Sequence, residues 1–571
     1  MKDIEKQQQG PLNDSTSESK ESPHRPEDAG LADESKDNVD EKGSQPPPAP
    51  AGGRSRTQII LLMSSLGVAV FLAAVDQVIV ATALPAIADS LGASSSTYAW
   101  IASSYLIANA SSIPIWGRIS DIFGRKPSIL SANVIFMVGS LISALAHDLT
   151  TLIAGRAVQG LGGGGLLVLA NICISDIFSL RERGFYLSIV GGVWAIASSI
   201  GPLLGGAFAE YVTWRWCFWI NLPIDAVSLV GLFFFLDVHN PRTPILDGIK
   251  AIDWLGALTS TGGTIMFLLG LDFGGSVYPW RSAPVICLIV FGVVTWALFV
   301  LIQWKVASFP LSPLRIFQSR STAAIMILCF FHAVAFISAV FYLPLYFQAV
   351  LGASPFFSGV WILALALPLA VASVVSGMVI LKTGHYLGPI IGGMVFLTLG
   401  VGLFIDFPDY RSWPRIIIYQ IIASLGMGPV FQAPIVALQT KLQPKDIAAG
   451  TSAFQFLRQL SSGIGVVIGQ VILTSQVRQK ASLFTGSGIP ASIASQLQSG
   501  SLVTAIRLRP ELNNAGELDA VKMAYTESLS TMWIFFTCAS ACGLVASLFI
   551  GQQVLTKKHQ EFKTGLQTQK T

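Results

Sequence analysis

Four charged residues lie inside apolar stretches of this sequence, where a charge is costly. They are Asp76 in FLAAVDQVIVATALP (71–85), Arg156 in AGRAVQGLGGGGLL (154–167), Asp225 at the end of WRWCFWINLPID (214–225) and Arg458 in FQFLRQLSSGIG (454–465). A charge at the centre of a bilayer costs roughly 2.5–3.5 kcal/mol on insertion scales, so such residues pair with one another or mark an ion or proton pathway. The four residues are therefore the first candidates for chemistry in this chain.

The composition explains why these charges are conspicuous. Of 571 residues, 52% are hydrophobic and 12% are charged, against about 25% charged in ordinary soluble domains. This predicts an all-α polytopic membrane protein. A net charge of +4 is too small to suggest nucleic-acid binding. The six cysteines fall mostly in apolar runs, so buried free thiols are expected, and the six scattered histidines show no metal-site spacing.

Apolar stretches of about 20 residues, the length that spans a bilayer, divide the chain. The sequence predicts fourteen spans, near 59–82, 97–117, 127–146, 150–175, 185–208, 216–236, 254–271, 283–303, 322–346, 357–381, 388–406, 414–437, 450–474 and 529–551. The domains expected from them are a disordered cytoplasmic tail (1–57), a six-helix half (58–237), two linker helices (238–321), a second six-helix half (322–551) with an outer loop (475–528), and a cytoplasmic tail (552–571).

Lys and Arg residues concentrate in one set of alternating short loops, which places both termini in the cytoplasm. An internal repeat supports two halves, because GRISDIFG (117–124) and GMVILKTG (377–384) follow the second span of each half. Such repeats mark secondary transporters, with the substrate site between the halves. No enzyme motif fits: the G-x-G-x-x-G at 160–165 lies in apolar helix with no preceding strand, which is not a dinucleotide site.

Asp76 and Arg156 are expected at the same depth. The first span runs outward and the fourth inward, and each residue lies about six residues from the outer end of its span. At about 1.5 Å per residue, both lie about 9 Å below the outer surface. A buried Asp76–Arg156 pair, direct or bridged by water, is the leading structural prediction.

The loop GRISDIFGRKP (117–127) concentrates charge and glycine between two spans. On its own it could be only a topological anchor on the cytoplasmic side. Its pattern and place resemble the most diagnostic loop of the major facilitator superfamily. The resemblance implies a gate latch that stabilises the outward-facing state, formed by Gly117, Arg118, Asp121, Gly124, Arg125 and Lys126. The second copy has Leu381 in place of Asp121, so its latch is expected to be degenerate.

The stretch SSIGPLLGGAFAE (198–210) contains a proline and small residues in the fifth span: Gly201, Pro202, Gly205 and Gly206. A kink that packs closely against a neighbour explains part of the pattern. In the superfamily, the pattern is associated with exporters that exchange substrate for protons. WRW…NLP further resembles the fourteen-span drug:proton antiporter branch. Asp225 departs from that branch and is either a second proton or substrate site or part of a satisfied pair.

Two stretches of the second half, FYLPLYFQAVLGASP (341–355) and 454–465, also resemble this branch. Several residues are candidates to line a roomy amphiphilic cavity, although core packing is the better explanation for each aromatic one taken alone. They are Gln159, Tyr342, Tyr346, Gln348, Phe454 and Gln455. By resemblance, Arg156 takes part in proton transfer, and the other intramembrane charges, Asp76, Asp225 and Arg458, are further candidates for proton coupling.

The resemblance covers about residues 57–555 and implies the major facilitator fold in a fungal exporter of toxins, antifungal drugs or secondary metabolites. The expected activity is proton-coupled antiport by alternating access, with protons, a small molecule and the bilayer as partners and the proton gradient in place of any cofactor. A monomer in the plasma membrane is expected, with a vacuolar or vesicle membrane as the alternative. A proton-coupled importer, for example of siderophore-iron complexes, and a non-transporting sensor remain alternative functions.

Overall fold

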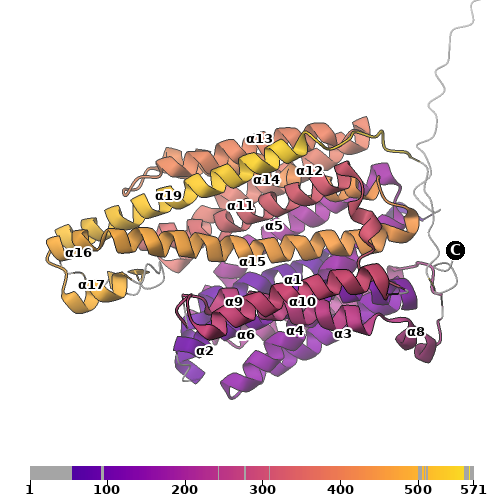
Figure 1. The fold of residues 1–571 in the computed structure, drawn as a ribbon, viewed down its shortest axis with the longest axis horizontal. Helices are drawn as coiled ribbons and strands as arrows, with labels where there is room; N and C mark the ends of the chain where they lie inside the picture. The colour runs from indigo at the N-terminus through magenta and orange to yellow at the C-terminus, as the bar shows by residue number, and fades with distance from the viewer. Residues whose placement is uncertain are drawn as a thin grey trace, which may run out of the picture. The chain divides into compact units, whose positions relative to one another are not determined.

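The computed structural model describes residues 54–571 apart from 92–94, 242, 276–277, 308, 499–504, 507, 510–511, 513, 558–564 and 566–571. Most of the N-terminal tail expected at 1–57, and part of the tail at 552–571, therefore lie outside the described residues. Within them the chain is helical, with one isolated bridge between Gly274 and Tyr278 and no strand. Figure 1 shows the helices running alongside one another.

The helices follow the predicted order. The first half consists of α1 (Arg56–Leu91), α2 (Ser95–Phe123), α3 (Arg125–Ala144), α4 (Leu149–Ile177), α5 (Leu180–Tyr211), α6 (Trp216–Trp219) and α7 (Asn221–Phe235). The linker contains α8 (Ile245–Ala251), α9 (Trp254–Phe273) and α10 (Ala283–Lys305). The second half consists of α11 (Arg320–Ala349), α12 (Pro355–Thr383), α13 (Leu387–Leu403), α14 (Trp413–Gln439), α15 (Ile447–Gln479), α16 (Ala481–Gly486), α17 (Ala491–Leu497) and α19 (Ala515–Ser547).

Several helix starts are set by polar capping residues. Asp148 precedes α4, and the Thr151 amide and hydroxyl donate to its carboxylate at 2.9 and 2.7 Å. These bonds hold the pKa of Asp148 below its ordinary value. Ser179 begins α5 with a capping box, in which the Ser179 amide donates to Glu182 Oε2 at 3.1 Å. These helices therefore begin at the short polar segments that separate the apolar spans.

Thirteen helical segments of the described chain are long and apolar enough to cross a membrane. The second predicted span is also a helix, α2. Helix α2 packs on α4 and buries Ser104, Asn109, Ser111 and Ser112, so these polar groups face protein rather than lipid. The chain is a multi-pass membrane protein.

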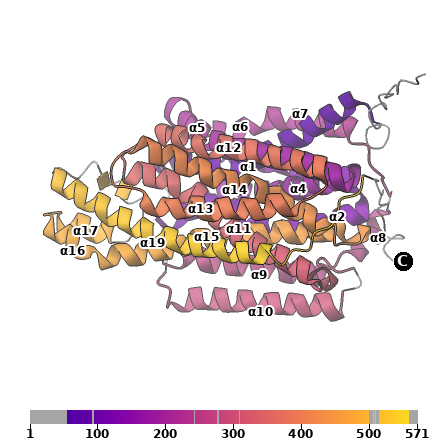
Figure 2. The ribbon, with the colours of Figure 1, turned by 90° about the horizontal axis from the view of Figure 1, so that it is seen from above.

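Two predictions from hydropathy differ from the structure. The segment 475–528, predicted as a loop, contains the end of α15, helices α16 and α17, and the start of α19. Lys480 and Glu527 form an ion pair at 2.6 Å there, and these helix ends extend past the others at the left of Figures 1 and 2. Of the cysteines, Cys287, Cys538 and Cys542 are exposed rather than buried, because an apolar run on a membrane helix also covers its outer face.

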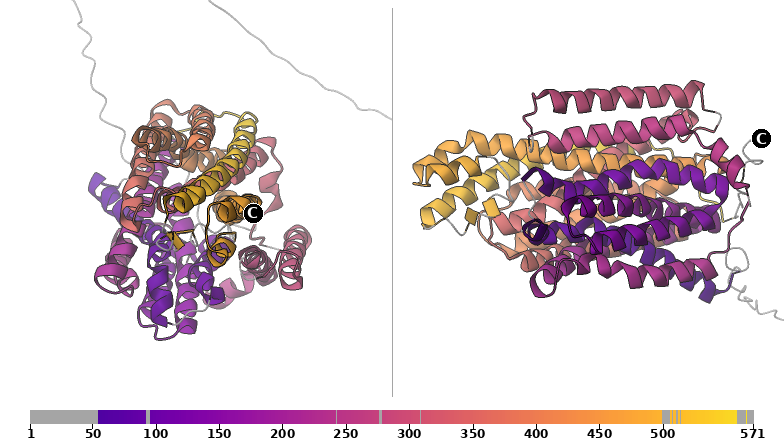
Figure 3. Two further views of the ribbon diagram at one scale, coloured as in Figure 1. Left: turned by 90° about the vertical axis from the view of Figure 1, so that its left-hand side faces the viewer. Right: turned by 90° about the horizontal axis from the view of Figure 1, so that it is seen from below.

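The packing repeats between the two halves. Helix α1 packs on α5 and α7 as α11 packs on α15 and α19, and α4 packs on α2 and α3 as α14 packs on α12 and α13. Two seams join the halves, α5 against α12 and α2 against α15. In Figures 2 and 3, α10 lies outside α9, and α9 in turn contacts α2 and α15. Helices α9 and α10 thus lie at one side of the bundle and do not interrupt the α5–α12 and α2–α15 contacts.

Candidate functional site

Asp76 lies on α1, fully buried, at the centre of a polar network. Arg156 Nη1 donates to Asp76 Oδ2 and forms an ion pair with it, so the contact predicted from depth is present. Gln159 Nε2 donates to Asp76 Oδ1 at 2.9 Å, and Asn221 Nδ2 donates to the same oxygen at 3.2 Å. The carboxylate is therefore held by three donors from α4 and α7.

Arg156 is also fully surrounded. Its guanidinium lies over the ring of Tyr105 at 4.4 Å and over that of Phe218 at 5.7 Å. Arg156 Nη1 also donates to Gln159 Oε1 at 2.8 Å. If Asp76 gains a proton, the carboxyl loses its charge and its hold on Arg156 weakens, while the neighbouring amides can still bind it. Binding of one proton by Asp76 can therefore break the ion pair that joins α1 to α4.

The glycines of the fifth span position α1 around Asp76. A Cβ on Gly201 would meet Val78 Cγ2 at 2.5 Å, and a Cβ on Gly205 would meet the Ile79 carbonyl oxygen at 2.0 Å. Thr82 Oγ1 donates to the Pro202 carbonyl at 3.0 Å. Gly206 has no neighbouring atom within 4 Å of where its Cβ would lie. Gly201, Pro202 and Gly205 thus hold α1 against α5, whereas Gly206 takes no part in this contact.

The loop 117–127 forms a buried charge cluster at the end of the bundle where α2, α4, α12 and α14 end, here called the Gly124 end. Arg125 donates to Asp121 Oδ1 at 2.7 Å and to Asp176 Oδ2 at 2.6 Å, and Arg118 pairs with Asp121 at 3.3 Å. Asp176, at the end of α4, was not identified from the sequence. In the sequence, only its position directly after a long apolar span could have indicated a functional role for Asp176.

Two glycines allow the chain around this charge cluster to pack closely against neighbouring segments. Gly124 has a φ of 98°, a left-handed conformation, and a Cβ there would lie 2.9 Å from Pro241 Cδ. A Cβ on Gly117 would lie 1.9 Å from Ser452 Oγ of the second half. Lys126 Nζ lies 5.3 Å from the centroid of the Phe233 ring. Gly117 therefore lies on the seam between α2 and α15, and Lys126 lies outside the buried cluster.

Replacing Arg125 with Leu is expected to lower stability markedly, because it leaves Asp121 and Asp176 buried without their cation. Breaking a buried pair in this way costs about 3–5 kcal/mol. The matched variant Lys126→Leu removes only a cation–π contact, which is worth about 0.5–1 kcal/mol at a partly exposed site. The measurement is the melting temperature of each purified protein in detergent. Similar melting temperatures for the two variants would contradict a stabilising role of the cluster.

The second copy of the loop uses a different acceptor. Leu381 supplies no carboxylate, but its carbonyl accepts from Arg181 Nε at 2.6 Å, and the Lys382 carbonyl accepts from Arg181 Nη2. Gly384 caps α12 in the left-handed conformation, with a φ of 74°. Free carbonyls at a helix C-terminus carry partial negative charge and so replace the missing acid. This copy therefore binds an arginine of the first half through its backbone.

Gln439 joins the halves at the Gly124 end and was not singled out in the sequence. It is buried at the end of α14, and its Nε2 donates to Ser175 Oγ of α4 at 2.7 Å and to Thr451 Oγ1 at 3.1 Å. Arg183 Nη1 of α5 donates to its Oε1 at 3.4 Å. These bonds, with those of Arg181, join the two halves at the Gly124 end in this conformation.

Asp225 lies apart from these contacts. It is buried on α7, which packs on α1 and α3, and the Asn133 side chain of α3 interacts with its carboxyl group. Asn221, which binds Asp76, precedes it by one helical turn on the same face. The structure thus places Asp225 about 6 Å along α7 from the Asp76 network, at a rise of about 1.5 Å per residue.

The candidate cavity residues do not gather at one place. Gln159 belongs to the Asp76 network, and Gln348 Nε2 donates to Ser358 Oγ at 3.3 Å. The hydroxyls of Tyr342 and Tyr346 donate to the carbonyls of Val466 and Pro408 at 2.5 and 2.6 Å, and both rings are buried in the packing of the second half. Phe454 and Gln455 lie on α15 next to Arg458.

A groove of about 780 Å³ is lined by residues of the first part of α1 and the first part of α5. Apolar side chains line most of it, with Arg56 among them, and it contains none of the candidate cavity residues. Among the described residues, no three His, Cys, Asp or Glu side chains gather where a metal could bind.

Comparisons with known proteins agree with this architecture. The Major Facilitator Superfamily pattern matches residues 66–248. The efflux pump dotC of Dothistroma septosporum is 48% identical over 518 residues, covering 91% of this chain and 88% of that protein. The MFS-type transporter ppz2 of Metarhizium majus is 47% identical over 516 residues, covering 90% and 88%. The efflux pump FUS6 of Gibberella fujikuroi is 34% identical, covering 89% and 92%.

Solved structures share the fold at low sequence identity. The human organic anion transporter MFSD10 has a TM-score of 0.52 at 14% identity, over 86% of this chain and 99% of that one. A double tryptophan mutant of XylE has a TM-score of 0.54 at 15% identity, over 87% and 96%. The full-length sequence similarity to the fungal proteins shows that this chain belongs to the major facilitator superfamily and is a membrane transporter, not an enzyme.

Proposed function

We propose that this chain exports small amphiphilic molecules from a fungal cell in exchange for protons. The observation that carries the proposal is the buried Asp76–Arg156 pair, a proton acceptor held against a cation inside the membrane-spanning part. The relatives named efflux pumps favour export, and the close α1–α5 contact around Gly205 gives the antiporter pattern of the fifth span a physical role.

The mechanism is alternating access, in which the two halves rock about the α5–α12 and α2–α15 seams. The Gly124 end faces the cytoplasm in this proposal, since the Lys- and Arg-rich loops lie there. The described conformation, closed at that end by Gln439 and Arg181, then corresponds to the state shut toward the cytoplasm. A plasma membrane location follows from the export function.

The coupling step is protonation of Asp76 from outside. Neutralising this carboxyl frees Arg156 and changes the contact between α1 and α4, which shifts the balance between the two conformations. Asp225, buried one turn from Asn221, serves as a second proton site on the cytoplasmic side of Asp76.

The direction of transport is tested in yeast cells that do or do not produce the protein. The probes are three naphthalene derivatives of matched size: 1-naphthalenesulfonate, 1-naphthalenesulfonamide and (1-naphthylmethyl)trimethylammonium. Export predicts lower steady-state accumulation of at least one probe in producing cells, and a protonophore should abolish the difference. Higher accumulation in producing cells would instead favour an importer.

A further inference from the structure

Arg458 is a buried arginine whose surroundings differ from those of Arg156. It lies on α15 with 8% of its surface exposed, and its Nη2 donates to the Phe431 carbonyl. Its Nε has no hydrogen-bond partner. Asp76 forms an ion pair with Arg156. Among the described residues, by contrast, no carboxylate forms an ion pair with Arg458. A buried cation without an anion is costly, so this site lacks a negative charge.

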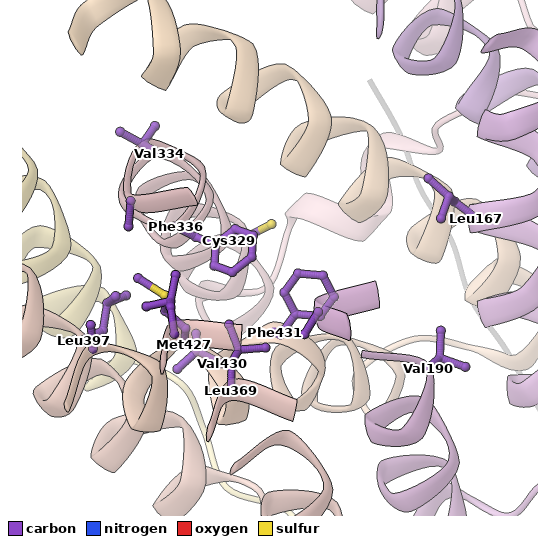
Figure 4. Close-up of a cluster of buried hydrophobic side chains, with 14 of the residues drawn as sticks. Leu167, Val190, Cys329, Val334, Phe336, Leu369, Leu397, Met427, Val430 and Phe431 are labelled. Carbon is purple, nitrogen blue, oxygen red and sulfur yellow. The ribbon is translucent and has the colours of Figure 1, made fainter. Parts of the chain in front are cut away.

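Aromatic rings form the walls around this guanidinium. It lies 4.4 Å from the centroid of the Phe431 ring and 4.9 Å from that of Phe454. Phe431 in turn packs with Phe336 of α11 at 5.4 Å and with Trp194 of α5 at 5.3 Å. Figure 4 shows Phe336 and Phe431 close together, with Val190 of α5 and Leu167 of α4 facing them from the first half. The rings thus form a cluster across the seam between the halves.

Further polar groups around this cluster are unsatisfied. The side-chain oxygens of Gln432 and Gln455 and the Nε2 of His332 are buried without hydrogen-bond partners. Gln455 precedes Arg458 by one turn of α15, and Gln432 reaches the α5 seam, where its Cγ would lie 3.0 Å from a Cβ on Gly191. Buried polar groups are normally paired, so several unpaired groups beside an unpaired cation indicate a place for a ligand.

The position along the bundle suits a substrate site. Gln459, next to Arg458, donates from Nε2 to Asn109 Oδ1 of α2 at 3.1 Å. Arg156 stacks on Tyr105, one turn away from Asn109 on the same helix. Arg156 Nε also donates to the Ile101 carbonyl of α2 at 3.4 Å, so the two arginines contact the same helix from opposite halves at levels about 12 Å apart, at a rise of about 1.5 Å per residue. Because Trp194 belongs to the first half and Phe336 to the second, rocking of the halves parts these rings.

We propose that Arg458 binds the acidic group of an aromatic organic anion, whose ring system inserts among Trp194, Phe336 and Phe431. The inference rests on the proposed export function and narrows its substrate class to amphiphiles with a carboxylate, sulfonate or phenolate. A guanidinium recognises such groups by charge-assisted hydrogen bonds. The aromatic cluster adds stacking and a low-polarity environment that strengthens the charge contact.

The test is equilibrium binding of 1-naphthalenesulfonate and 1-naphthalenesulfonamide, which share a ring system and differ in charge, to the purified full-length protein. The wild type is expected to bind the sulfonate at least about tenfold more tightly. Arg458→Gln should remove this preference without weakening sulfonamide binding, and Arg458→Lys should retain part of it. Arg415→Gln is the matched control, because it removes an exposed arginine of the same half that pairs with Asp406.

Equal binding of the two probes to the wild type would overturn the proposal, as would an undiminished preference in Arg458→Gln. Because the wild-type comparison needs no variant, the proposal stays testable even if Arg458→Gln does not fold. The export function fails separately: if no probe moves in response to a proton gradient while the preference depends on Arg458, antiport is wrong and the anion site stands. Proton-driven transport with no Arg458-dependent preference would mean that antiport stands and the anion site is wrong.

Discussion

Replacing Asp76 with Asn is expected to reduce proton-driven transport to the level of vesicles that lack the protein. Asn keeps the size and some hydrogen bonds of Asp76, but it cannot exchange a proton and cannot form the ion pair with Arg156. The measurement is uptake of the exported probe into inside-out vesicles under an imposed pH gradient, corrected for the amount of protein in the membrane. Asp148→Asn is the control, since Asp148 caps α4 at the surface and Asn caps helices equally well.

Loss of folding has to be separated from loss of coupling in this experiment. Asp76→Asn leaves Arg156 buried without its anion, at a cost of about 3–5 kcal/mol. The double variant Asp76→Asn, Arg156→Gln removes both charges and should recover much of that stability while remaining uncoupled. Normal proton-driven uptake by Asp76→Asn would rule out Asp76 as the coupling site. A charge-swapped variant, Asp76→Arg with Arg156→Asp, tests the pairing itself by recovery beyond either single change.

Replacing Gly205 with Ala is expected to slow transport by about tenfold or more, whereas Gly206→Ala should leave it nearly unchanged. The Cβ added at Gly205 would overlap the Ile79 carbonyl oxygen at 2.0 Å, so α1 has to move away from α5. Overpacking of this kind costs about 1–3 kcal/mol and here displaces the turn that carries Asp76. The Cβ added at Gly206 meets no neighbour within 4 Å and improves helix propensity by about 1 kcal/mol.

Initial rates of uptake into the same vesicles compare these two variants directly. They alter adjacent residues of one motif by the same methyl group, so differences in expression or in general helix stability largely cancel. Equal rates for the two variants would mean that the α1–α5 contact does not position the coupling site.

The depth of Asp76 and Arg156 shows what the sequence can predict about the site. A helix rises about 1.5 Å per residue whatever its neighbours are, so counting residues from the ends of two spans was sufficient to bring the two charges to one level. The cost of burying a charge in a membrane then favoured a pair, and the structure contains it. The all-α membrane-spanning class followed in the same way from span length and composition, whereas the major facilitator fold was implied by the resemblance of motifs such as the loop at 117–127.

Side-chain contacts between neighbouring helices could not be predicted by counting residues along each helix. Asn221 binds Asp76, Asp176 binds Arg125 and Gln439 joins the halves, yet none of these three was identified beforehand. In a soluble helix the apolar stripe marks the buried face, but a membrane helix is apolar toward lipid and toward protein alike. The rotation of each helix, and so the partner of each polar side chain, is left open by the sequence.

The sequence by itself determined the membrane-spanning class, the order and places of the helices, the level of the Asp76–Arg156 pair and the glycine-rich loop at 117–127. Only the tertiary structure decided that Gly205 touches α1 while Gly206 does not, that backbone carbonyls replace the missing acid at Leu381, and that Arg458 lacks the anion that Arg156 has. The physical reason is that axial position depends on the rise of one helix, whereas these contacts depend on how several helices rotate and cross.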